Sequence, residues 1–137
     1  MNSHYELTDA EFESAFESAS LDPVLFSHEA HLRLAWIHIN KYGVDAAIEN
    51  IRSQISAYTK SLGADDKYHE TLTIVGVRAV HHFMLRSKTT DFKAFIQENT
   101  KLMNQFKDLV DSHYHQDIFT SDLARTVFIE PDKEPFN

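Results

Sequence analysis

The chain has 137 residues, of which 42% are hydrophobic and 25% charged, and its formal net charge is −8. This composition, with ten Phe, five Tyr and one Trp, excludes a disordered polar chain and suits one folded domain. The acidity also argues against a general nucleic-acid binder, which needs a basic surface for the phosphates. We therefore expect no nucleic-acid partner.

The sequence contains no cysteine, so any metal site must use His, Asp, Glu or Tyr side chains. The N-terminus lacks the basic start and apolar run of a signal peptide, and the longest apolar stretches are too short for a membrane span. We expect a cytoplasmic protein with no membrane partner. No glycine-rich phosphate loop or nucleotide fingerprint occurs, so no nucleotide cofactor is expected.

The chain is expected to be all-α, because it has only three Gly and three Pro and its apolar residues recur at helical spacing. Capping residues and helix breakers indicate about five main helices and a short C-terminal one. The predicted helices span residues 8–20, 27–42, 45–62, about 68–86, 91–113 and 121–128, with Thr8, Ser27, Asp45 and Ser121 as N-caps. A break at Asn99-Thr100 would divide the fifth.

We expect a single helical domain over residues 1–137, with irregular termini at 1–7 and 130–137 and with His4 in the frayed N-terminus. Short connections make successive helices antiparallel neighbours. The second and fourth helices would then run in the same direction, with their N-termini at one end of the bundle. His38, His81 and His82 lie further along these two helices, where they could form a second polar cluster, although surface positions are expected, especially for His82.

Three histidines at that end of the bundle are candidate metal ligands. His28 and His31 share one helical face, because they are three residues apart, and His69 begins the fourth helix. Three neutral imidazoles with an open position suit a divalent transition metal: Zn, Fe, Mn, Ni or Cu. The same residues are also consistent with a metal-free pocket, or with histidines that only satisfy buried polar groups.

The first functional hypothesis is a metal-dependent enzyme that acts on a small molecule, of a hydrolase or oxygenase type. The metal would polarise a substrate oxygen or activate water or dioxygen. Glu70 would serve as a base or as an acid that orients a histidine, and Tyr114 would donate a hydrogen bond or proton. Both residues are therefore candidate catalytic groups.

The second hypothesis is a metal-free protein that binds an anionic or aromatic small molecule. It would use Arg33, the histidines and two helix N-termini. The candidate ligand-binding residues are Arg33, Trp36, Tyr68 and Thr73, although Trp36 also suits the core. Arg33 lies among apolar residues, so it needs a carboxylate partner, for which Glu29 and Glu70 are the candidates. The third hypothesis is a structural or interaction module, including a homodimer formed through an apolar helix face.

Three segments resemble a group of small bacterial proteins of uncharacterised function. They are Phe26-Ser27-His28-Glu29-Ala30-His31-Leu32-Arg33-Leu34-Ala35-Trp36, Lys67-Tyr68-His69-Glu70-Thr71-Leu72-Thr73, and residues 121–132. The likeness covers most of the chain from Pro23 on and implies no activity. A looser architectural likeness to DinB-like bundles, which hold a metal with three histidines, is an analogy only, because the histidine spacings here differ.

Overall fold

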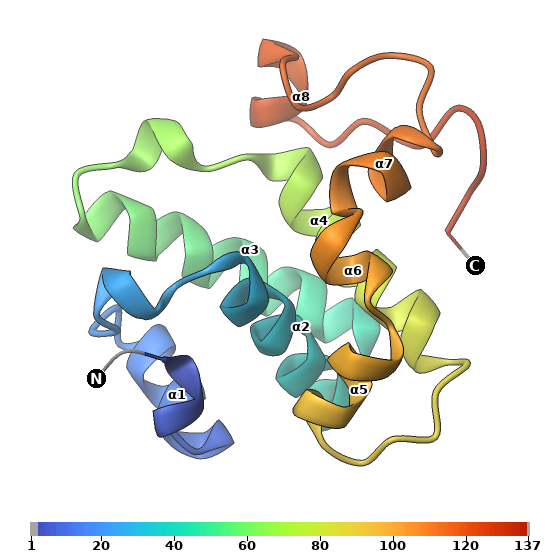
Figure 1. Ribbon diagram of the computed structural model, residues 1–137. Coiled ribbons are helices and arrows are strands. Elements are labelled where there is room, and N and C mark those ends of the chain that lie inside the picture. The colour runs from blue at the N-terminus through green and yellow to red at the C-terminus, as the bar shows by residue number, and fades with distance from the viewer. Residues whose placement is uncertain (1–2, 137) are drawn as a thin grey trace. The chain divides into compact units, whose positions relative to one another are not determined.

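The computed structural model describes residues 3–136 of the chain, and Figure 1 shows its ribbon. The predicted all-α fold is confirmed, since the described residues form eight α-helices and no β-strand. The contacts divide the chain into two compact units, of which the first runs to Tyr68 and the second begins at His69. In residues 3–136 no helix combines the length and apolar character that crossing a bilayer requires.

The first unit contains three α-helices. They are α1 (Asp9–Glu17), α2 (His28–Tyr42) and α3 (Val44–Ser61), with short 3₁₀ turns at His4–Glu6, Pro23–Leu25 and Asp65–Lys67. Thr8 and Ser27 cap α1 and α2 as predicted, because each side-chain oxygen accepts a backbone N–H of the first helical turn. Residues His4–Glu6 form a 3₁₀ turn with Ser3 as its N-cap, so the prediction of an irregular, frayed start is wrong for this segment. Met1 and Asn2 lie outside the described residues.

The core of the first unit lies where α1 packs against α2 and α3. Its largest side chains are aromatic: Phe16 contacts Phe26 and Tyr58, with ring centroids 4.8 and 4.7 Å apart. The Tyr58 hydroxyl donates to the carbonyl of Leu21, so this buried phenol has a partner. The apolar contacts fix α2, whose first turn carries two of the predicted metal ligands.

A single residue, Gly43, joins α2 to α3. Its backbone has φ +87° and ψ 164°, a region that only glycine adopts without strain. Gly43 is therefore the N-cap of α3, which begins at Val44, and the prediction of Asp45 as N-cap is wrong. Asp45 lies within the first turn instead, where its negative charge favours the helix N-terminus.

The second unit contains α4 (Glu70–Met84), α5 (Phe92–Glu98), α6 (Lys101–Asn104), α7 (Phe106–Asp111) and α8 (Asp122–Thr126). The predicted fifth helix is broken twice: once at Asn99-Thr100, as expected, and again at Gln105. Ser121 caps α8 as predicted. The residues after α8 are irregular, in agreement with the predicted terminus, apart from Asn137, which lies outside the described residues.

The core of the second unit joins α4, α7, α8 and the segment between α7 and α8. Fully or nearly buried members are Val75, Val110, Tyr114, Ile118 and Ala124. Three residues that follow α8 pack against this cluster: Phe128, Ile129 and Phe136. The C-terminal tail (residues 127–136) is thus part of the second unit's packing.

Substitution by alanine should change the stability of the protein in opposite directions at Gly43 and at Gly76. Gly43→Ala should lower the free energy of unfolding by about 1–3 kcal/mol, because a side chain strains this backbone conformation. Gly76→Ala, inside α4, should raise it by up to about 1 kcal/mol, because alanine favours a helix more than glycine does and a Cβ there meets no atom within 4 Å beyond its chain neighbours and its own helix backbone. Urea unfolding of both variants measures the two changes in unfolding free energy. Equal changes for the two substitutions would contradict the prediction.

Candidate functional site

The first turn of α2 presents an oriented imidazole. The carbonyl of Ser27 lies 3.1 Å from Nδ1 of His31, so Nδ1 carries the hydrogen and donates it. The Phe26 ring lies against the imidazole, with ring centroids 3.7 Å apart. Within residues 3–136, Nε2 of His31 has no hydrogen-bond partner, and its lone pair is therefore available.

The electrostatic state of His31 suits a ligand or a base. Burial of the ring, the largest effect, and the nearby His28 lower the pKa of His31 to about 4, against a smaller opposite effect of the Ser27 carbonyl. The residue as a whole is nevertheless exposed to solvent, which moderates this decrease. A lowered pKa leaves the imidazole neutral at pH 7.

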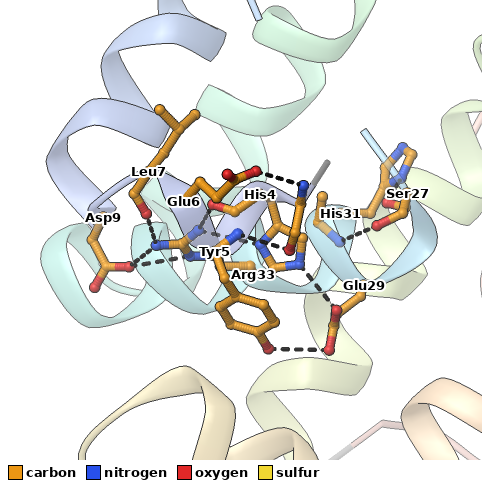
Figure 2. Close-up of polar contacts among 11 residues, drawn as sticks. His4, Tyr5, Glu6, Leu7, Asp9, Ser27, Glu29, His31 and Arg33 are labelled. Atoms are coloured by element: carbon orange, nitrogen blue, oxygen red, sulfur yellow. Dashed lines mark hydrogen bonds and ion pairs between the residues drawn. The ribbon is translucent and has the colours of Figure 1, made fainter. Parts of the chain in front are cut away.

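Arg33, predicted to bind a ligand, has all five of its N–H donors directed at protein atoms (Figure 2). Nε and Nη2 both donate to Oδ1 of Asp9, at 3.2 and 2.8 Å. The remaining donors reach the carbonyl oxygens of His4 and Leu7 and Nδ1 of His4. The carboxylate partner is thus Asp9, and the prediction of Glu29 or Glu70 is wrong.

Glu29 binds the N-terminal segment instead. Its Oε1 lies 3.1 Å from Nε2 of His4, and its Oε2 accepts from the hydroxyl of Tyr5 at 3.0 Å (Figure 2). His4 is almost completely buried by these contacts. Sequence reasoning missed this network, because its members are separated by more than twenty residues.

His69, the predicted third metal ligand, is the N-cap of α4. Its Nδ1 accepts the backbone N–H of Leu72 at 3.0 Å, and its Nε2 lies 2.9 Å from the carbonyl oxygen of Ile118. Nε2 must therefore carry the hydrogen, and both ring nitrogens are in use. Burial lowers the pKa of His69, so this neutral form persists at pH 7.

The predicted catalytic Tyr114 holds the C-terminal tail. It is buried, and its hydroxyl donates to the carbonyl of Ile129 at 2.7 Å. Burial raises the pKa of Tyr114 to about 12, so the phenol stays protonated at neutral pH. The neighbouring Thr71 binds both sides of the same tail segment: its hydroxyl donates to the Val127 carbonyl and accepts the Ile129 N–H.

The other predicted residues are distributed as follows. Trp36 is buried in the first unit, and Tyr68 ends the 3₁₀ turn before α4. Glu70 is the first residue of α4 and is half-buried. The hydroxyl of Thr73 donates to the carbonyl of His69 at 2.7 Å within the helix. The predicted ligand-binding and catalytic roles of these four residues stay predictions.

His38 is a further titratable residue that the sequence placed wrongly. It was expected at the surface but is almost completely buried, and its Nε2 has no hydrogen-bond partner in the described chain. Its Nδ1 lies 3.5 Å from Nδ2 of Asn50. Burial, the largest effect, lowers the pKa of His38. Because a charged imidazole is disfavoured at this buried position, we expect His38 to be neutral at pH 7.

The predicted metal ligands fall in different units: His28 and His31 in the first and His69 in the second. Their convergence therefore stays a prediction. Within either unit, the described residues include no group of three or more His, Asp or Glu side chains that could hold a metal ion.

Comparisons with protein-family models, curated proteins and solved structures found no match. The resemblance to a group of small bacterial proteins accordingly stays a prediction.

Removing the Thr71 hydroxyl should loosen the C-terminal tail. Thr71→Val keeps the shape but leaves the Val127 carbonyl and the Ile129 N–H without their partner, which should cost about 1–3 kcal/mol of unfolding free energy. The Ile129 amide should also exchange its hydrogen faster. Thr73→Val is the matched control on the same helix and should cost about 0.5 kcal/mol or less. Equal protection of Ile129 in all three proteins would contradict the assignment.

Proposed function

We propose that the protein binds a small molecule at the N-terminal end of α2, where Nε2 of His31 contacts it. The observation that supports this proposal is the hydrogen bond from Nδ1 of His31 to the Ser27 carbonyl. It fixes the tautomer and leaves the Nε2 lone pair free, while the ring rests against Phe26. Arg33, His69 and Tyr114 already bind protein groups through the atoms that a ligand would need.

The free Nε2 defines the chemistry of the ligand. A neutral imidazole accepts a hydrogen bond from a hydroxyl or N–H group and takes its proton if that group is activated. We therefore expect a ligand with such a donor, and an enzyme of this kind would use His31 as its general base.

A metal-dependent enzyme is the second candidate, and one observation favours it. A histidine whose Nδ1–H binds a backbone carbonyl is oriented as metal-binding histidines usually are, with Nε2 toward the metal. His28 is three residues earlier on the same helical face and would be the second ligand. Because both ring nitrogens of His69 bind protein groups, the metal would be held by two histidines and complete its shell with water or substrate.

The proposal predicts unusual reactivity of His31 at low pH. Diethyl pyrocarbonate modifies only neutral imidazole, and a histidine with the ordinary pKa of about 6.5 is mostly protonated at pH 5. His31, whose pKa is lowered, should therefore react at pH 5 about tenfold faster than N-acetylhistidine in the same solution. Peptide mass spectrometry locates the adduct.

The matched control for this experiment is His115→Gln, an exposed histidine in the other unit, which should leave the modification of His31 unchanged. A His31 that reacts no faster than N-acetylhistidine would exclude an accessible, neutral Nε2 and with it the proposal.

The metal candidate has a separate test. Protein purified without a histidine tag should bind one equivalent of Zn²⁺ in a calorimetric titration, and binding should be lost in both His28→Ala and His31→Ala. His115→Ala, an exposed histidine, is the control that should bind normally. Binding that persists in His69→Ala supports the two-histidine site, whereas its loss would favour the three-histidine site. No Zn²⁺ binding by the wild type would rule out both.

A further inference from the structure

The N-terminal latch, which we define as residues 4–7, is held on α2 through the ring of His4. Nδ1 of His4 lies 3.2 Å from Nη1 of Arg33, and Nε2 lies 3.1 Å from Oε1 of Glu29 (Figure 2). Arg33 also binds the backbone carbonyls of His4 and Leu7, at 2.6 and 2.9 Å. Two side chains of α2 therefore bind both ends of the segment.

The partners of the His4 ring determine its protonation state. A guanidinium can only donate hydrogen bonds, so Nδ1 of His4 must offer its lone pair to Arg33. The single ring hydrogen then lies on Nε2 and is donated to Glu29. This arrangement requires a neutral His4.

Protonation of His4 would turn its attraction to Arg33 into a repulsion. Nδ1 would gain a hydrogen that faces an N–H of the positively charged Arg33, and that hydrogen bond would be lost. The groups that face the ring are Arg33 and Glu29 from α2, Tyr5 beside it, and Phe12 from α1. Asp9 of α1 is already bound to Arg33, and Glu29 is the carboxylate in contact with the ring at this buried position.

We propose that the latch is sensitive to acid: protonation of His4 releases residues 4–7 from α2 and uncovers the side chains of Arg33 and Glu29. The proposal is independent of the small-molecule site at His31, because it rests on a different set of contacts. Burial of the ring, the largest effect, lowers the pKa of His4 in the closed state, which is consistent with the required neutral form.

The pH range follows from the sign of that shift. The released His4 has an ordinary pKa near 6.5, and the bound His4 has a lower one. Above pH 6.5 both states are neutral and the latch stays closed. Below pH 6.5 the released state gains a proton that the bound state does not, so release becomes up to about tenfold more favourable per pH unit. This gain ends once the pH falls below the lowered pKa.

Hydrogen exchange of the Leu7 amide measures the latch, because this N–H donates to the His4 carbonyl within the turn. After correction for the intrinsic exchange rate at each pH, its protection should fall between pH 6.5 and pH 5. Amides in the middle of α2 should keep their protection, which separates local release from global unfolding.

His4→Gln is the informative variant. A glutamine amide can accept from Arg33 and donate to Glu29 but does not titrate, so the Leu7 protection should become independent of pH. His115→Gln, in the other unit, is the matched control and should keep the wild-type pH dependence. Wild-type protection that is unchanged between pH 7 and pH 5, or an equal loss of protection in wild type and His4→Gln, would overturn the proposal.

If the Leu7 amide of the His4→Gln protein is unprotected even at pH 7, the wild-type protein is used for the test instead. The His4 ring is then titrated by NMR, and its midpoint is compared with that of the Leu7 exchange. Coinciding midpoints support release by His4, and different midpoints would overturn it.

Discussion

Buried donors and acceptors must find hydrogen-bond partners, and this constraint determines how the polar residues of the chain are used. In the first unit, the buried guanidinium of Arg33 is satisfied by two backbone carbonyls, a carboxylate and an imidazole. In the second unit, Thr71 and Tyr114 satisfy the backbone of the tail around Ile129. Arg33, a predicted ligand-binding residue, thereby holds residues 4–9, and Tyr114, a predicted catalytic residue, holds the C-terminal tail.

The sequence predicted the helices well where local signals decide their ends. Thr8, Ser27 and Ser121 are caps in both the prediction and the structure, because capping depends only on the next three residues. Local signals failed where distant residues decide: Arg33 binds Asp9, and the frayed start became an ordered turn. The partners of these groups come from contacts between segments, which helical periodicity does not encode.

The candidate site was predictable only in part. The helical pattern placed His28 and His31 at the start of one helix, and the structure agrees. It could not indicate that Nδ1 of His31 binds the Ser27 carbonyl, or that His69 caps its own helix. These hydrogen bonds decide which imidazoles keep a free lone pair, and they give His31 a different chemical character from His4 and His69.

The roles proposed for these histidines therefore depend on which ring nitrogen carries the hydrogen. A long-range ¹H–¹⁵N correlation spectrum at pH 7 distinguishes the two neutral forms directly for every imidazole. We expect the hydrogen on Nδ1 in His31 and on Nε2 in His4 and His69. A spectrum in which His31 carries its hydrogen on Nε2, or in which His69 shares the His31 form, would contradict the account.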